Sequence, residues 1–265
     1  MQVKNLHKTD YWNNYYSSEE LIHVKLKAGL FTSYDIFLCD NILQKYIPKY
    51  RGKLKNQPKI CEIGSGDGKL LKKLATMCGA KPYGIEYSKS AAEISKKNGI
   101  TTIVSDAFDK NIIKKYKNKF DIVFSYGFVE HIIPPEKAIK LHLELTKPGG
   151  YFVVQIPRFK GFNFWRIKFF RPDLIPGHNL TIMNEDKLEK ICKINGVQKI
   201  FCSNYGTYKL RIPMDKKNYK YYLLKFLCNI EYLLNPLSRL LFGNNGYETK
   251  FFSPAVIFIG RKLSK

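Results

Sequence analysis

Three glycines at alternate positions form the first feature of the sequence that could bind a ligand. They are Gly64, Gly66 and Gly68, in the stretch ICEIGSGDGKL at positions 60–70, and the apolar run before them carries one acid, Glu62. Glycine adopts backbone conformations that other residues avoid, and it lets the main chain come close to a bound molecule. A short apolar run, a glycine turn and a helical pattern in this order indicate a ligand-binding turn.

The residues of this turn argue against a pyrophosphate ligand. A dinucleotide-binding fingerprint needs a third glycine at position 69, where Lys69 stands, and the Gly-Lys-Ser/Thr sequence of a phosphate-binding loop is absent. The carboxylate of Glu62 would also repel phosphate, and it could instead pair with a cation. We therefore expect a ligand that has no pyrophosphate.

Two further acids stand where the next two strands are expected to end. Glu86 lies at the end of the second strand, where a carboxylate can accept both hydrogens of a ribose diol. Asp106 ends the third strand and could accept from an exocyclic amine, while Ala107 offers a backbone N–H. An isolated acid after a strand is usually a helix cap. Three polar groups at the ends of three successive strands indicate a binding site much more strongly.

Alternating strand-like and helix-like segments between residues 59 and 156 are expected to position these groups. KICEIG, KPYGIEY, ITTIVSD, FDIVFSYG and YFVVQIP have the character of buried strands, and the segments between them have helical spacing. Ser88 is a plausible N-cap for the helix before Gly99. Repeated β-α units of this kind predict a parallel sheet with helices on both faces and a ligand at the carboxyl ends of the strands.

The segments on either side of this core are expected to complete one domain. We predict a single domain over residues 1–265, made of an N-terminal helical lid at 1–55, a cofactor-binding core at 56–157, and a substrate region with the last strands at 158–265. Within the last part, residues 158–183 form an aromatic and basic stretch that we expect to be a long loop. An apolar helical insertion then precedes a final strand, SPAVIFIGRK.

The ordered motifs EIGSGDG, GIEYS, SDAF, FDIVFSYGFVEHI and LTKPGGYFVVQIP resemble those of the class I S-adenosylmethionine-dependent methyltransferases. The resemblance covers roughly residues 55–157, and GHNLTIMNEDKLEKICKINGV looks like the helix and strand that follow in the family. It implies an α/β fold with a Rossmann-like, doubly wound, seven-stranded sheet in the order 3-2-1-4-5-7-6, whose last strand is antiparallel. It also implies S-adenosylmethionine as the cofactor, and the ammonium and sulfonium groups of that molecule would suit the acid at Glu62.

The resemblance also assigns cofactor-binding residues. It places Glu62 and the glycines at the methionine part, Glu86 at the ribose, and Asp106 with Ala107 at the adenine. The segment DYWNNYY resembles an aromatic segment that covers the cofactor in many relatives, although its aromatic residues could instead only pack the lid against the sheet; Tyr34 is a less specific candidate. The complete set expected to bind the cofactor is Tyr11, Trp12, Tyr16, Glu62, Gly64, Ser65, Gly66, Gly68, Glu86, Tyr87, Asp106, Ala107, Ser125 and Tyr126.

Methyl transfer to a hydroxyl needs a base, and histidine is the usual choice near neutral pH. His131 follows the fourth strand, close to the place expected for the methyl group, although it could also be a structural residue that ties the loop to the next helix. His178 is the second candidate, because its loop is expected to face the substrate. Tyr126 and Glu130 are further candidates for the catalytic role.

The sequence after the fourth strand restricts the acceptor. SYGF at 125–128 lacks the N/D-P-P-Y/F tetrapeptide of enzymes that methylate the amines of adenine or cytosine, so a nucleic-acid acceptor is not expected. FVEHI and the following basic stretch look like bacterial methyltransferases of secondary metabolism, quinone biosynthesis and surface-polysaccharide clusters. A group of basic side chains favours a phosphate or carboxylate on the acceptor, or else a solvated or membrane-facing surface. These side chains are Arg158, Lys160, Arg166, Lys168 and Arg171.

We expect O-methylation of a small anionic or sugar-linked acceptor. A nucleotide sugar or a phosphate-linked precursor of a capsular polysaccharide, phosphoramidate groups included, would satisfy the basic residues. A second hypothesis is a quinone- or lipid-type methyltransferase at a membrane surface, which residues 221–242 could contact as a covering helical hairpin or as a helix lying on the lipid. A third is an RNA methyltransferase that uses the net charge of +23, and a fourth is a cofactor-binding scaffold without activity.

Composition sets the remaining expectations. The excess of 45 basic over 22 acidic residues is spread along the chain, which is also what a general compositional bias produces. The six cysteines form no C-x-x-C pair and no metal-ligand spacing with histidine, so we expect a reduced, cytoplasmic protein without a metal. Peripheral contact with the inner face of a membrane is compatible with this expectation, and a monomer or a homodimer is expected.

Overall fold

A seven-stranded mixed sheet organises the chain. The computed structural model describes residues 3–7, 9–17, 31–50, 57–214 and 217–264. In these residues the strand order is β4-β3-β2-β5-β7-β9-β8, with β9 antiparallel to both of its neighbours. The strands are β2 (Lys59–Ile63), β3 (Lys81–Glu86), β4 (Thr101–Val104), β5 (Phe120–Tyr126), β7 (Thr146–Pro157), β8 (Val197–Tyr205) and β9 (Ala255–Lys262).

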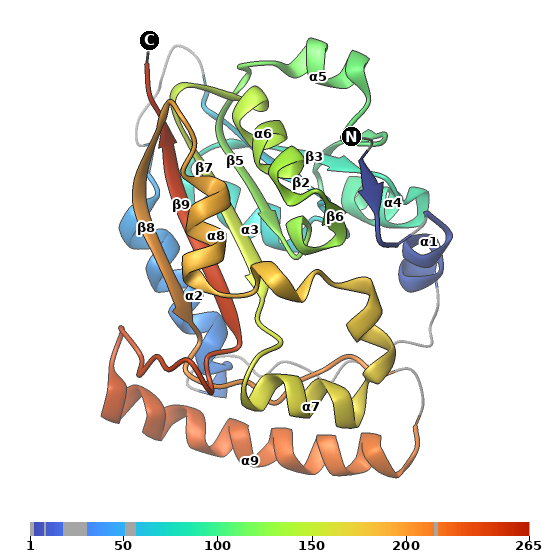
Figure 1. Cartoon of the computed structure of the whole chain (residues 1–265), viewed down its shortest axis with the longest axis vertical. Coiled ribbons are helices and arrows are strands. Elements are labelled where there is room, and N and C mark those ends of the chain that lie inside the picture. Colours follow the sequence, from blue (N-terminus) through green and yellow to red (C-terminus); the bar gives the residue numbers. More distant parts are fainter. Residues whose placement is uncertain (1–2, 8, 18–30, 51–56, 215–216, 265) are drawn as a thin grey trace.

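This topology confirms the expected fold class. When the seven strands are numbered along the chain from β2, their order reads 3-2-1-4-5-7-6 and the last strand is the antiparallel one. The first five strands run parallel, so their carboxyl ends meet at one edge of the sheet, which is the lower edge in Figure 1. Strand β9 pairs with both β7 and β8, so the last strand of the chain lies inside the sheet and β8 forms its edge.

Helices cover both faces of the sheet, and its central strands β2, β5, β7 and β9 are accordingly buried over most of their length. Ile122 and Phe124 of β5 belong to the same core as α2 and α3, whereas Val123 packs with α6 on the other face. The side chain of Ser88 caps α4 by accepting from Ala91 N, as expected. The covering helices are α2 (Tyr34–Tyr46), α3 (Lys69–Cys78), α4 (Lys89–Lys97), α5 (Lys110–Tyr116), α6 (Pro135–Leu145) and α8 (Glu185–Cys192).

The segment expected to be a long loop is helical instead. Residues 158–183 contain α7 (Phe162–Phe170) and two short 3-10 helices, η3 (Pro172–Gly177) and η4 (Leu180–Ile182). The expectation was wrong because the aromatic and basic side chains of α7 mask the helical spacing of its buried residues, Asn163, Arg166, Ile167 and Phe170.

The apolar insertion before the last strand is one continuous helix rather than a hairpin. Helix α9 (Tyr219–Phe242) runs through Pro236 without a break. Together with α7 it lies beyond the carboxyl ends of β5 and β7, at the bottom of the molecule in Figure 1. Among the described residues, no helix is long and apolar enough to cross a membrane.

The described part of the N-terminal region divides between two places. A short ladder joins β1 (Lys4–Asn5) to β6 (Ile132–Ile133), and α1 (Thr9–Ser17) then packs near α4. Helix α2 packs instead against β8 and α9 (Figure 1). Residues 1–2, 8, 18–30 and 51–55 of the expected lid lie outside the described residues, and the domain boundaries at 55 and 157 remain predictions.

A buried network of charges fixes α9 to the rest of the fold. Arg211 donates to Glu231 Oε1 at 2.8 Å and to both carboxylate oxygens of Asp35 at 2.8 and 2.9 Å. The backbone N–H of Leu210 donates to the other oxygen of Glu231 at 2.7 Å. Burial opposes ionisation of Asp35, but Arg211 and Lys209 hold its pKa below the usual range. The guanidinium of Arg211 thus binds both α2, through Asp35, and α9, through Glu231.

Replacing Arg211 with methionine is expected to destabilise the protein strongly. The substitution leaves the carboxylates of Asp35 and Glu231 buried without their shared cation, so the free energy of unfolding in urea should fall by about 3–5 kcal/mol. The control is Arg261→Met, because Arg261 is exposed and donates only to the carbonyl of Gly149; this variant should cost less than about 0.5 kcal/mol. Equal losses for the two variants would contradict the role given to the network.

Candidate functional site

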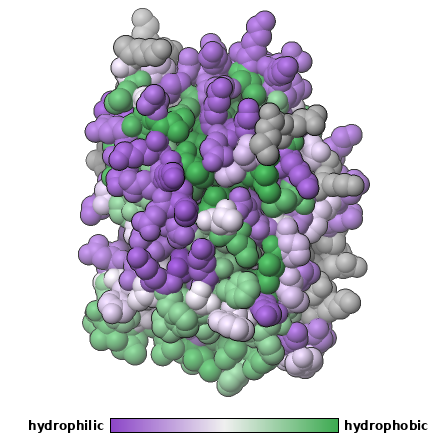
Figure 2. Space-filling view, in the orientation of Figure 1, coloured by the Kyte–Doolittle hydropathy of each residue, from purple (hydrophilic) through white to green (hydrophobic). Residues whose placement is uncertain are grey.

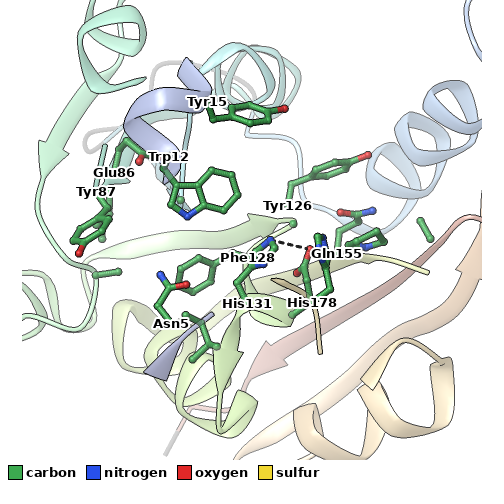
Figure 3. A pocket seen from close by; sticks show the side chains of 18 of the residues that line it. Asn5, Trp12, Tyr15, Glu86, Tyr87, Tyr126, Phe128, His131, Gln155 and His178 are labelled. Atoms are coloured by element: carbon green, nitrogen blue, oxygen red, sulfur yellow. Dashed lines mark ion pairs between the residues drawn. The ribbon is translucent and has the colours of Figure 1, made fainter. Parts of the chain in front are cut away.

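A cavity of about 440 Å³ lies at the carboxyl edge of the sheet. Its lining includes residues at or just after the ends of five strands: Gly64, Glu86, Asp106, Tyr126 and Pro157. This volume falls within the range of about 300–1,000 Å³ that is usual for small-molecule sites. In Figure 3, Glu86 and Tyr87 occupy one side of the cavity, and His131, His178 and Gln155 occupy the other. The cavity therefore has two chemically different ends.

The glycine turn and Glu86 form one connected structure. All three glycines adopt left-handed backbone conformations, with φ of 70°, 51° and 74° at Gly64, Gly66 and Gly68. The N–H of Gly66 donates to Glu86 Oε2, and the N–H of Ser88 donates to Glu86 Oε1, each at 2.7 Å. Burial raises the pKa of Glu86, and these N–H groups oppose the rise. Because a carboxylate oxygen can accept more than one hydrogen bond, both oxygens can still accept from a ribose diol.

Glu62 is a buried acid directly before this turn. Burial, followed by the neighbouring charges of Glu86 and Asp67, raises its pKa well above the usual value, while the N–H of Leu71 acts in the opposite direction. Its Oε2 atom has no hydrogen-bond partner among the described residues. Glu62 does not line the cavity, and a cation bound above the glycine turn would favour its charged form. The electrostatics of the turn fit a positively charged ligand.

The adenine end is formed by the segment after β4. Asp106 Oδ1 accepts from Phe108 N at 2.9 Å, and this bond fixes the carboxylate in the turn. Ser105, Ala107 and Tyr87 also line the cavity here, as expected for the last two. Together with Glu86, this segment offers acceptors for a ribose and an amine, and these residues fit the nucleoside part of S-adenosylmethionine.

Helix α1 covers the glycine turn with aromatic side chains. Trp12 and Tyr16 line the cavity as expected, and Tyr15, which sequence reasoning did not single out, lines it as well. The hydroxyl of Tyr16 occupies the space where a side chain at Gly66 would lie. Tyr11 does not line the cavity; its ring stacks on that of His7 at 3.9 Å between centroids.

Four other expected cofactor or lid residues have different surroundings. Ser125 is buried with its hydroxyl 3.0 Å from His142 Nε2, on the strand face opposite to that of Tyr126, so its side chain does not reach the cavity. Tyr34 donates to the carbonyl of Gly243 and packs under α9, which excludes it from covering a cofactor. Neither Ser65 nor Gly68 lines the cavity; Ser65 packs against Gly84 of β3, and Gly68 packs against α4.

The two histidines expected to be catalytic lie together at the other end of the cavity. His131 Nδ1 is 2.6 Å from the carbonyl of Gly177, and His178 Nδ1 is 2.6 Å from the carbonyl of Leu174. Because a carbonyl can only accept, each Nδ1 carries the proton and each Nε2 is left without one. Burial lowers the pKa of His131 to about 3 and that of His178 to about 4, so both rings are neutral. Tyr126 and Glu130 line the same cavity.

A third histidine joins this pair through the ladder between β1 and β6. Leu6 N donates to the carbonyl of His131 at 2.8 Å, which places the next residue, His7, against both rings. One ring nitrogen each from His7, His131 and His178 lies within 4.8 Å of the others, so the three could hold a metal ion. Sequence spacing gave no sign of this group, because its members come from three separate segments.

The arginines expected at the mouth of the site are structural. Arg158 donates to the carbonyls of Lys250 and Ser253, and Arg166 donates to that of Arg211. Arg171 pairs with Asp173 and donates to the carbonyl of Pro213. All three are buried, and none lines the cavity. The three arginines thus donate to backbone carbonyls inside the protein, and their clustering in the sequence does not indicate recognition of an acceptor.

Two lysines of that group do not line the cavity either. Lys168 is exposed, with its ammonium 5.5 Å from the ring centroid of Trp165, and Lys160 is half-buried. A cation that does line the cavity is Lys209, whose ammonium is 3.9 Å from Asp35. Sequence reasoning missed Lys209 because it follows the sixth core strand in no recognised motif.

Substituting Gly66 with alanine is expected to weaken cofactor binding. The added Cβ would overlap the Tyr16 hydroxyl, so either α1 or the turn must move away from the ribose site. We expect the affinity for S-adenosylmethionine, measured by calorimetry, to fall by about tenfold to a hundredfold.

Gly99→Ala is the matched control for this substitution. Gly99 also has a left-handed backbone, with φ of 83°, but no atom lies within 4 Å of a Cβ placed there. Both variants should lose similar stability from backbone strain, on the order of 1–2 kcal/mol, and only Gly66→Ala should lose affinity. Unchanged binding by both variants would show that the contact between α1 and the turn does not shape the site.

Comparison with solved structures supports this assignment of the fold. A phosphoethanolamine N-methyltransferase of Haemonchus contortus, solved in complex with S-adenosylmethionine, superposes with a TM-score of 0.53 and is 17% identical. The superposition covers 96% of this chain and 56% of that one. A likeness at this identity concerns the fold.

Two curated relatives match the core of the chain. A ubiquinone biosynthesis O-methyltransferase of Shewanella sp. (strain ANA-3) is 24% identical over 120 residues, which is 44% of this chain and 50% of that protein. A tRNA U34 carboxymethyltransferase of Desulfotalea psychrophila is 27% identical over 126 residues, which is 45% of this chain and 37% of that protein. The chain thus spans half or less of the length of these relatives, and their acceptors differ.

The sequence profile of the methyltransferase domain matches residues 36–200, which is more than half of the chain. That range contains the glycine turn, Glu86, Asp106 and both cavity-lining histidines. The chain therefore belongs to the methyltransferase domain family.

Proposed function

We propose that this methyltransferase methylates a hydroxyl group of a small, lipid-soluble acceptor, which it meets at the surface of an anionic membrane. The observation that carries the proposal for the chemistry is the pair of neutral histidines, His131 and His178, at the end of the cavity opposite Glu86 (Figure 3). Amines need little assistance in methyl transfer, whereas a hydroxyl must lose a proton. Two unprotonated imidazole nitrogens beside the reaction space favour a hydroxyl acceptor.

In this proposal, residues at one end of the cavity bind the cofactor, and residues at the other end bind and activate the acceptor. Bound S-adenosylmethionine supplies a methyl group on a sulfonium, which is already activated for displacement. Glu86 and the segment at Asp106 would hold its nucleoside, and Trp12 with Tyr16 would cover it and exclude water. His131 would accept the hydrogen bond of the acceptor hydroxyl and take its proton as the methyl group is transferred. Alignment of this kind can supply about 7–11 kcal/mol of the barrier reduction at best.

The lining of the cavity favours an apolar or aromatic acceptor over a phosphate-bearing one. The sugar-phosphate expectation rested on the five basic residues of the α7 segment. None of them lines the cavity, and its three arginines donate to carbonyls of the protein itself. The acceptor end is lined by Tyr126, Phe128 and its histidines, and the cation that does line the cavity, Lys209, is 3.9 Å from Asp35. The relative named for ubiquinone biosynthesis acts by O-methylation, as its name says, and this agrees with our proposal for the reaction.

Helix α9 presents large apolar residues outward, and its buried side mixes polar with apolar residues. Its buried side includes Glu231, Asn235 and Ser238, whereas its exposed side carries a stripe of large apolar residues. Leu240 is 81% exposed, Leu233 is 68% exposed, and Trp165 of the adjacent α7 is 63% exposed. We call this surface the apolar face; Figure 2 shows it as the largely green lower end of the molecule. A continuous apolar surface of this kind marks an interaction site.

Charge around the apolar face favours an anionic membrane as its occupant. Lys168, Lys220 and Lys225 lie on α7 and α9 beside the apolar residues, and the chain as a whole has a net charge of +23. An interfacial helix of this type inserts its apolar side into the headgroup boundary while the basic residues attract anionic lipid. The face lies at the same end of the sheet as the cavity, so a membrane-bound acceptor would be close to the site (Figure 1).

Replacing His131 with asparagine tests the proposed chemistry. With labelled S-adenosylmethionine and a total lipid extract, the wild-type protein should place label in the organic phase, and His131→Asn should do so about 10²–10⁴ times more slowly because the proton acceptor is lost. The affinity for S-adenosylmethionine should stay the same.

Ser125→Ala is the matched control, since its side chain lies away from the cavity and the variant should keep the wild-type rate. An unchanged rate for His131→Asn would contradict its role as base. Label that remains in water-soluble product would contradict the lipid-soluble acceptor.

Vesicle flotation tests the membrane surface. The wild-type chain should float with vesicles that contain phosphatidylglycerol and less with pure phosphatidylcholine. A triple substitution of Phe226, Leu233 and Leu240 by glutamate should abolish flotation, because it places three charges along the apolar stripe. Glutamate at Ile194 and Leu263, two exposed residues at the other end of β8 and β9, should leave flotation intact.

Two results of this experiment would contradict the proposal. One is a triple variant that floats like the wild type. The other is a wild-type chain that is a stable dimer without lipid and becomes a monomer in the triple variant, because the apolar face would then join two copies of the chain.

A further inference from the structure

Three histidines from separate parts of the chain converge beside the acceptor end of the cavity. We call His7, His131 and His178 the histidine cluster. The ring centroids of His131 and His178 are 4.5 Å apart, and those of His7 and His131 are 5.0 Å apart. One nitrogen of each ring lies within 4.8 Å of one nitrogen of both others. His131 and His178 line the cavity, and His7 lies against them from the N-terminal segment.

Backbone carbonyls orient two of these rings as they do in metal sites. The Nδ1–H groups of His131 and His178 donate to the carbonyls of Gly177 and Leu174, each at 2.6 Å. Metal-binding histidines commonly use one ring nitrogen in this way, which fixes the ring and leaves the other nitrogen for the ion. The ring of His7 occupies the space where a side chain at Gly177 would lie. Gly177 therefore accepts from His131 through its carbonyl and, because it has no side chain, leaves room for the ring of His7.

The cluster contains more unsatisfied acceptors than its surroundings can serve. His7 Nε2 is buried and has no hydrogen-bond partner among the described residues, and the same holds for Glu130 Oε2. The other oxygen of Glu130 is 3.8 Å from His131 Nε2. Buried acceptors without a donor are costly. A cation at the centre of the cluster would offer His7 Nε2 a partner.

We propose that the histidine cluster binds a divalent transition-metal ion of the zinc class, with an open coordination position toward the cavity. Three imidazole ligands and a free position are the arrangement of a catalytic zinc site. Imidazole also suits cobalt, nickel and copper, whereas magnesium and calcium prefer oxygen ligands. At tetrahedral angles the nitrogens bound to one zinc ion lie roughly 3.4 Å apart. The three ring nitrogens lie within 4.8 Å of one another, so the rings would have to close by up to roughly 1.4 Å to hold the ion.

This inference goes beyond the proposed function, because ion binding requires neither cofactor nor acceptor. A bound ion would offer its open position to an oxygen of the acceptor, and it would replace hydrogen bonding to His131 as the means of holding the hydroxyl. The site would then favour acceptors in which a hydroxyl or a neighbouring oxygen can reach the ion.

Cobalt titration tests the site directly. The full chain, prepared without a polyhistidine tag and freed of metal with a chelator that is then removed, should bind one equivalent of Co²⁺ and show the visible absorption of a tetrahedral or five-coordinate ion. Zn²⁺ should displace it stoichiometrically. His7→Ala and His178→Ala should each weaken Zn²⁺ binding by at least about 100-fold, since each removes a ligand.

Two controls establish that the cluster itself holds the ion. Tyr11→Phe keeps the ring that stacks on His7 and should bind Zn²⁺ like the wild type. Binding of S-adenosylmethionine by each variant shows that the fold is intact, and it does not depend on methyl transfer. The inference is overturned if the wild type binds no equivalent of Co²⁺, or if binding persists unchanged in both His7→Ala and His178→Ala.

Discussion

The shared guanidinium of Arg211 is the interaction on which the arrangement of the C-terminal half depends. Glu231 can be buried only because Arg211 and the N–H of Leu210 satisfy its two oxygens. The same cation binds Asp35 of α2, so α2 and α9 are held on one centre. With Glu231 fixed inward at this centre, the large apolar residues on the opposite side of α9 face outward. The apolar face is thus a consequence of how α9 is fixed, and it is kept although an exposed apolar surface lowers solubility.

The two ends of the cavity are built by different means. The cofactor end comes from turns that directly follow β2, β3 and β4, so each group is placed by its own strand. The acceptor end needs segments that are distant in sequence: the N-terminal ladder, the loop after β5 and the segment η3. Groups placed by their own strands suit a cofactor that many proteins bind in the same way. Loops from distant parts of the sequence can instead differ between proteins that share the sheet, so the acceptor end can vary.

What the sequence could predict follows the same division. Glu86 and Asp106 were predictable because strand ends in a parallel sheet share one edge. The side chain of Ser125 could have been excluded from the cavity, since strand alternation points neighbouring residues to opposite faces and Tyr126 already faces it. The burial of Arg158 and Arg166 was not predictable, because their partners are carbonyls far along the chain. The contact of His7 with His131 depends on pairing of two short segments with weak strand character.

That pairing has a kinetic consequence. The ladder between β1 and β6 consists of two residue pairs, and α1 adds a hydrogen bond from Lys89 N to Asn13. Breaking these hydrogen bonds and the side-chain contacts of α1 costs less free energy than opening the sheet, so residues 3–7 and 9–17 can detach while the core stays folded. Their detachment carries Trp12 and Tyr16 away, and with them the cover over the glycine turn. The frequency of this opening would then limit how fast spent cofactor leaves and, with it, the turnover rate of the enzyme.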